Sequence, residues 1–196
     1  MLTKGTMVHA ALEKVFELKR GERTLENLHN LLRLEWSQAK TDNESTYGSL
    51  FGTREEEREW GLSALSLLDN YWDIEDPSSL PSDPVFRERW VRANINDGEE
   101  GEFNVRGIID RMDLVRVQGD EDAVGAICDY KTGKAPDLKY SKATNERIRE
   151  DKFFQLKIYA LLMREMNRGR KDGQMVSDQF NSTKTETDDM TVRVLR

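Results

Sequence analysis

The chain has 196 residues, enough for one domain with a hydrophobic core but too few for two domains of ordinary size. Charged residues make up 34% and hydrophobic residues 37%, a composition that favours a folded chain over a disordered one. No stretch approaches the roughly 18 apolar residues of a membrane span, and the single cysteine excludes a disulfide framework or a zinc ribbon. We therefore expect a soluble intracellular protein, of unknown compartment, that makes no contact with a membrane.

Charge is distributed unevenly along the chain. The net charge of −7 argues against a protein that coats nucleic acid through bulk electrostatics. Residues 131–171, however, carry twelve Lys and Arg against five Asp and Glu, whereas residues 1–100 carry twelve against twenty. A polyanion is expected to dock near the segment after Lys131, although a solvated basic helix explains the charge equally well.

Helical periodicity dominates the first 75 residues. Apolar residues recur at helical spacing over residues 6–16, 25–36 and 60–71. Thr53 is followed three residues later by Glu56, which is the spacing of a capping box and predicts the start of the third helix. Segment 76–84, with three prolines and three serines, predicts a loop.

After this loop the hydrophobic period changes to two. Alternation predicts strands over residues 85–95, 103–110 and 123–131, an extended run at 114–117 and turns at 97–102 and 118–122. An antiparallel meander is the simplest arrangement. A helix over 153–166, a long loop over 167–190 and a strand-like end over 191–196 complete an α/β (α+β) chain. We expect a single domain over 1–196, truncated at one or both ends.

The predicted strands carry a candidate metal site. Asp129 and Lys131 are two positions apart, so on a regular strand both side chains lie on one face. Asp110 ends the neighbouring predicted strand, and cross-strand partners are about 5 Å apart. Mg²⁺ and Mn²⁺ prefer carboxylate oxygens together with substrate phosphate oxygens, so this grouping indicates phosphodiester chemistry.

Four motifs, in order along the chain, resemble those of the PD-(D/E)xK nuclease superfamily, in its RecB-like branch. They are Gly5-Thr6-Met7-Val8-His9, Gly107-Ile108-Ile109-Asp110-Arg111-Met112-Asp113, Asp129-Tyr130-Lys131-Thr132-Gly133 and Gln155-Leu156-Lys157-Ile158-Tyr159. Each motif is weak alone, but their order and their expected elements make a strong joint signal. The resemblance implies a restriction-endonuclease-like core, in which helices flank a central mixed sheet with an antiparallel meander.

The resemblance also implies roles for individual residues. The catalytic residues would be Asp110, Asp129, Lys131, Gln155 and Tyr159. The ligands of Mg²⁺ or Mn²⁺ would be His9, Asp110, Asp129 and the backbone carbonyl of Tyr130. Some relatives carry an iron–sulfur cluster, for which this chain lacks the cysteines.

His9 and two acids near the motifs, Asp113 and Glu88, need separate consideration. His9 shares a helical face with Leu12 and Phe16 and, taken alone, is more typical of a core or boundary residue. Asp113 is three positions beyond Asp110, which favours a structural salt bridge with an arginine over metal binding. Glu88, in the preceding strand, is a weaker candidate for assisting the site.

The sequence therefore predicts a metal-dependent deoxyribonuclease, an exonuclease acting on single strands or DNA ends in repair or recombination, with a helicase subunit as a possible partner. The alternative is a catalytically silent module of the same fold that binds DNA or a helicase. A nuclease directed at RNA is a third possibility that nothing in the sequence excludes.

Overall fold

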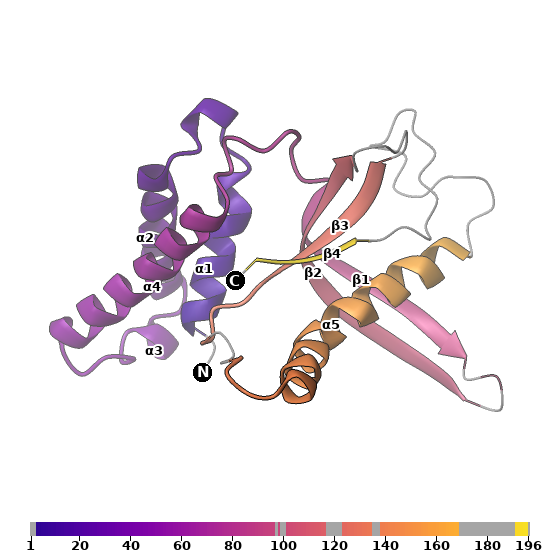
Figure 1. The fold of residues 1–196 in the computed structure, drawn as a ribbon. Helices are drawn as coiled ribbons and strands as arrows, with labels where there is room; N and C mark the ends of the chain where they lie inside the picture. The colour runs from indigo at the N-terminus through magenta and orange to yellow at the C-terminus, as the bar shows by residue number, and fades with distance from the viewer. Residues whose placement is uncertain are drawn as a thin grey trace. The chain divides into compact units, whose positions relative to one another are not determined.

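A computed structural model of the chain describes residues 3–96, 98, 101–116, 123–134, 138–168 and 191–195. These residues fall into two compact units (Figure 1). The helical unit comprises Met1–Asp83, Tyr130–Lys134 and Leu195–Arg196, and the sheet unit comprises Pro84–Asp129 and Ala135–Val194. The expectation of a single domain stays a prediction.

The helical unit is built from the predicted helices of the first 75 residues. Its elements are α1 (Thr3–Val15), the 3₁₀ turn η1 (Arg20–Glu22), α2 (Leu25–Asp42), α3 (Glu44–Tyr47) and α4 (Arg54–Ile74). Helices α1, α2 and α4 pack on one another around a common apolar core. The core includes Val8, Leu12, Phe16, Leu28, Leu32, Ala64, Leu68 and Tyr71, which are all buried.

Side-chain caps set the starts of the two long helices. The predicted capping box at the start of α4 is confirmed, because Thr53 Oγ1 accepts from the Glu56 amide and the Glu56 carboxylate accepts from the Thr53 amide. Thr24 caps α2 in the same way through the amide of Asn27, 3.2 Å away. Helix α2 continues to Asp42, six residues beyond the prediction, and the short helix α3 was not predicted.

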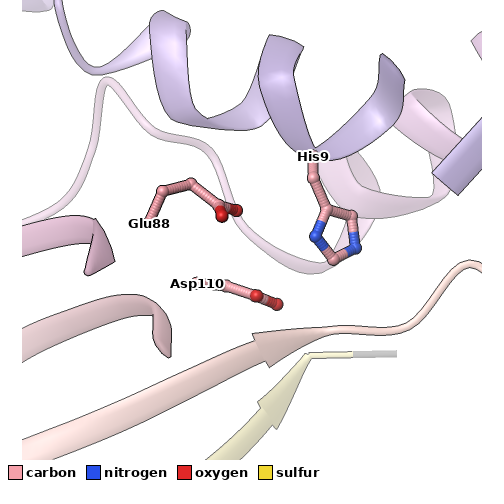
Figure 2. A group of neighbouring side chains, drawn as sticks. All are labelled: His9, Glu88 and Asp110. Carbon is pink, nitrogen blue, oxygen red and sulfur yellow. The ribbon is translucent and has the colours of Figure 1, made fainter. Parts of the chain in front are cut away.

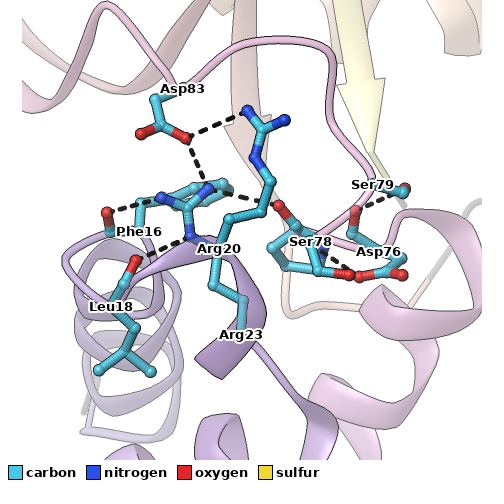
Figure 3. Close-up of polar contacts among 9 residues, drawn as sticks. Phe16, Leu18, Arg20, Arg23, Asp76, Ser78, Ser79 and Asp83 are labelled. Atoms are coloured by element: carbon cyan, nitrogen blue, oxygen red, sulfur yellow. Dashed lines mark hydrogen bonds and ion pairs between the residues drawn. The ribbon is translucent and has the colours of Figure 1, made fainter.

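A buried arginine ties the end of α1 to the loop that follows α4 (Figure 3). The Arg23 side chain is 3% exposed. Its guanidinium donates to the backbone carbonyls of Phe16 (3.2 Å), Leu18 (3.1 Å) and Pro77 (3.4 Å), and pairs with Asp83 at 2.6 Å. This arrangement satisfies a buried charge and fixes the proline-rich loop inside the helical unit.

The sheet unit contains the predicted meander. Its strands are β1 (Phe86–Asn96), β2 (Glu102–Arg116), β3 (Ala123–Tyr130) and β4 (Thr191–Leu195), in that order across the sheet. The pairs β1–β2 and β2–β3 are antiparallel, as expected. Strand β2 joins the two extended runs predicted at 103–110 and 114–117. The turn predicted at 118–122 lies outside the described residues.

Helix α5 (Lys142–Arg168) packs against β1 and β2. Its Leu156, Tyr159, Leu162 and Met163 form a core with Val91, Ile109, Met112 and Ile127 of the strands. The helix begins eleven residues before the predicted start, because Ser141 Oγ accepts from the Thr144 amide as a polar cap. It also includes residues 167 and 168 of the predicted loop, whose remainder up to residue 190 lies outside the described residues.

The predicted α+β class is confirmed: helices accompany a sheet whose first three strands are antiparallel. Within the described part of the chain, we find no helix with the length and hydropathy needed to cross a lipid bilayer.

Candidate active site

Two carboxylates lie opposite each other on the first two strands of the sheet. The β1–β2 register pairs Arg87 with Arg111 and Arg89 with Ile109, so that Glu88 lies across from Asp110. A carboxylate oxygen of Glu88 and one of Asp110 are within 4.8 Å of each other (Figure 2). Asp110 is buried and Glu88 is half-buried. Like charges at this separation repel each other unless a cation or proton offsets them.

The backbone of Glu88 is strained at this point. Its φ angle is +43°, in the left-handed region that residues with a Cβ atom rarely adopt. Such a conformation costs roughly 1–2 kcal/mol in a residue other than glycine. Strained residues of this kind cluster at functional sites, where the surrounding structure holds them in place. The observation therefore supports a functional role for Glu88.

Asp129 extends this pair to a row of three acids. The β2–β3 register ends at the pair of Arg111 and Cys128, and Asp110 and Asp129 are the next residues along the two strands. Asp129 is 3% exposed. Glu88, Asp110 and Asp129 thus lie on the three adjacent strands β1, β2 and β3, all within the sheet unit.

Lys131 follows this row but lies outside the strand. Strand β3 ends at Tyr130, one residue earlier than predicted, so strand alternation does not by itself place Lys131 beside Asp129. The Lys131 side chain is exposed, whereas that of Asp129 is buried. The ammonium group is therefore carried on the segment that leaves the sheet.

The first and third motifs contact each other inside the helical unit. The His9 ring on α1 meets the Tyr130 ring edge to face, with centroids 5.8 Å apart. A Cβ atom on Gly5 would lie 3.1 Å from the hydroxyl oxygen of Thr132, which leaves little room for a larger residue. Helix α1 thus packs directly on the Asp129–Gly133 motif through Tyr130 and Thr132. His9 is half-buried, as expected for a boundary residue, and its role as a metal ligand stays a prediction.

The second and fourth motifs contact each other inside the sheet unit. Gln155 Nε2 donates to Tyr159 Oη over 2.7 Å, one helical turn along α5. A Cβ atom on Gly107 would lie only 2.5 Å from Cε1 of Tyr159, so the ring lies almost on the β2 backbone. Tyr159 is buried and Gln155 is exposed. Gly107 thus lets α5 approach the strand that carries Asp110.

A buried ion pair supports the row of acids from within the sheet. Arg111, which is fully buried, donates to Asp113 Oδ2 from Nε (3.1 Å) and from Nη2 (2.7 Å). Cys128 Sγ lies 3.5 Å from both partners. The predicted salt bridge of Asp113 with an arginine is confirmed. Since Arg111 and Cys128 directly adjoin Asp110 and Asp129 in the chain, the pair fixes the strands at the site.

The residues in the row suit a hard divalent cation. All three acids offer carboxylate oxygens, the ligands that Mg²⁺, Mn²⁺ and Ca²⁺ prefer. The sequence alone did not bring Glu88 together with Asp110, because its position opposite Asp110 depends on the strand register. The available signal was that Glu88 is the one acidic residue in the alternating strand predicted over 85–95. The Tyr130 carbonyl as a ligand stays a prediction.

Comparison with known proteins agrees with this arrangement. Residues 2–195 match the family model described as PD-(D/E)XK nuclease superfamily. No curated protein and no solved structure matches the chain. The α+β architecture, with its antiparallel strands and accompanying helices, is consistent with a restriction-endonuclease-like fold.

Proposed function

The chain belongs to the PD-(D/E)XK nuclease superfamily, and from this premise we propose that it is a deoxyribonuclease dependent on Mg²⁺ or Mn²⁺. The observation that carries the proposal is the approach of Glu88 and Asp110, whose carboxylate oxygens lie within 4.8 Å of each other on β1 and β2, with the buried Asp129 on the adjacent strand β3. Phosphodiester cleavage develops negative charge on phosphate oxygens, and a metal ion held by acids of this kind would offset that charge. The site residues are proposed here from their types and positions.

In this proposal, Asp110 and Asp129 bind the metal ion, with Glu88 as an additional acid. When bound, the ion would neutralise charge on the phosphodiester and lower the pKa of an attacking water. His9 is proposed as a further ligand, supported by its contact with Tyr130, which adjoins Asp129 in the chain. The imidazole is a known ligand type for Mn²⁺ as well as for softer ions.

Lys131 is proposed as the catalytic lysine. Its ammonium group would stabilise the charged transition state or orient the attacking water. Being exposed and just beyond β3, it can reach a substrate that approaches from solvent. Gln155 and Tyr159 are proposed to line the site, and their mutual hydrogen bond orients both polar groups.

The finer function is proposed from the motifs. Their resemblance to the RecB-like branch favours an exonuclease acting on single strands or DNA ends in repair or recombination, working with a helicase subunit. The basic segment 131–171, with its net charge of +7, supports a polyanionic substrate. It includes the whole of α5, whose Arg147, Arg149 and Lys152 are exposed.

A cleavage assay tests the proposal. End-labelled and internally labelled oligonucleotides, single-stranded and duplex, are incubated with Mg²⁺, Mn²⁺ or a chelator. We expect cleavage only with metal, and a loss of about 100-fold or more in Lys131→Ala and Asp129→Asn. Lys134→Ala is the matched control, because it removes an exposed lysine three residues further on. Absence of cleavage with either metal, while the oligonucleotides still bind, would favour the catalytically silent module.

A further inference from the structure

One face of the β1–β2 ribbon carries exposed aromatic and basic side chains. Strand alternation places six side chains on one side of the two strands. We call this surface the ribbon face; it consists of Trp90, Arg92 and Asn94 of β1 and Asn104, Arg106 and Ile108 of β2. The alternate residues Val91 and Ile109 are buried in the core with α5, on the other side. The ribbon face therefore lies opposite the helix.

Trp90 is 63% exposed, although it is among the largest apolar side chains of the protein. The Arg106 guanidinium lies 6.0 Å from the centroid of its ring, at the outer limit of a cation–π contact. An exposed tryptophan on a strand does not gain the favourable free energy of burying its apolar ring unless a ligand covers it. Rings held in this way provide stacking surfaces for unpaired bases.

Arg92 and Arg106 face each other directly across the two strands. Like charges at this position destabilise a β-sheet pair. Neither arginine forms an ion pair with any residue in the described ranges, and both are exposed. Two facing guanidinium groups are therefore complementary to an anion such as a phosphate group. The next pair, Asn94 and Asn104, is joined by a hydrogen bond of 2.7 Å and adds neutral polar groups.

The ribbon face also begins at the candidate active site. Glu88 precedes Trp90 by two residues, and Asp110 follows Ile108 by two residues, so about 7 Å of strand separates each pair. Along the ribbon, the order is acids, then tryptophan, then paired arginines, then asparagines. At the far end, the exposed Glu102 would repel a phosphate and limits the binding surface.

We infer that the ribbon face binds single-stranded nucleic acid, with an unpaired base stacked on Trp90 and the following phosphate bound by Arg92 and Arg106. The placement of the bound strand next to the scissile bond rests on the proposed nuclease function, but binding of the strand to the ribbon face does not. Because the face of a base is accessible for stacking only when the strand is unpaired, this surface selects single strands over duplex. The proposed contacts do not distinguish DNA from RNA, since base stacking and phosphate contacts are common to both.

The inference is tested by binding without cleavage. A dye-labelled oligo(dT) or oligo(rU) 12-mer and a DNA duplex are titrated in chelator, with the full chain and its variants. We expect Trp90→Ala to bind single strands about tenfold or more weakly and Trp90→Phe to stay within about threefold of the parent. Arg92→Ala combined with Arg106→Ala should reduce the slope of log affinity against log salt by about 1.4. Whether these losses occur with oligo(dT) or with oligo(rU) shows whether the surface binds DNA or RNA.

Phe154→Ala is the matched control, because it removes an aromatic side chain that is 62% exposed on α5. Binding by Trp90→Ala within twofold of the parent would overturn the inference, as would an equal loss of duplex binding. If the chain cleaves normally but Trp90→Ala binds like the parent, the inference fails and the proposed function stands. If no cleavage occurs but Trp90→Ala loses single-strand binding, the proposed function fails and the binding surface stands.

Discussion

Gly107 on β2 and Tyr159 on α5 approach each other so closely that a Cβ atom at position 107 would lie 2.5 Å from Cε1 of the ring. Two of the four motifs therefore depend on each other for their packing. The contact holds α5 against the strand that carries Asp110, and the Tyr159 hydroxyl is oriented by Gln155. The glycine of the second motif is thus explained by the tyrosine of the fourth.

Gly107→Ala is expected to destabilise the protein by about 1–3 kcal/mol, because the buried ring cannot move away without disturbing the α5 core. Urea unfolding measures the change. Gly125→Ala is the matched control, since its Cβ atom would also meet a side-chain atom at 2.5 Å, but that atom is the flexible end of Met112. Equal losses in both variants would show that the tyrosine imposes no special constraint.

Asp113→Ala is expected to cost about 3–5 kcal/mol, because it removes a carboxylate that accepts two hydrogen bonds from the fully buried Arg111. The double variant Arg111→Met/Asp113→Val should recover most of this loss, since it removes both charges together. Thermal unfolding with denaturant titration gives both values. Glu146→Ala, which breaks the exposed pair with Lys142, should change stability by less than about 0.5 kcal/mol. A double variant as unstable as Asp113→Ala would contradict this account of the pair.

Glu88→Gln should affect stability differently with and without metal. In chelator, removing one of two facing carboxylates should stabilise the chain by about 1 kcal/mol, or about 2–4 °C in Tm. In Mn²⁺, the parent should gain more than the variant, because ligand binding stabilises the folded state in proportion to affinity. Differential scanning fluorimetry at matched ionic strength measures both. Glu102→Gln, on the same strand pair, should show neither effect.

The stability of the helical unit should depend on pH through Glu57. Hydrogen bonds from Lys40 and Trp36 hold the pKa of the Glu57 carboxyl below its usual value. The resulting stabilisation is complete above the ordinary pKa of about 4.5 and is lost as the pH falls through the lower pKa of the folded state. The Tm difference between the parent and Glu57→Gln should therefore be largest near pH 7 and shrink below about pH 4. Glu59→Gln, exposed on the same helix, should show no such trend.

Local signals in the sequence were sufficient for many elements. The Thr53–Glu56 spacing predicted the start of α4, because a capping box is complete within four residues. Alternation predicted the meander, since one face of each strand packs on α5. The salt bridge of Asp113 followed from its spacing after Asp110.

Features that depend on distant parts of the chain were missed. The first turns of α5 are polar and show no apolar periodicity, so only the Ser141 cap marks their start. Glu88 gains its place opposite Asp110 from the strand register, which a single strand does not reveal. The positive φ of Glu88 also has no signature in the sequence. Glycine or asparagine usually marks such a position, and this one is occupied by a glutamate.

Soaking crystals of the protein with Mn²⁺ and recording anomalous diffraction shows whether the acids on adjacent strands bind a divalent metal ion. We expect a peak at about 2.0 to 2.6 Å, the usual range for such ions, from carboxylate oxygens of Asp110 and Asp129. A crystal that binds Mn²⁺ elsewhere, or not at all at millimolar concentration, would contradict this expectation.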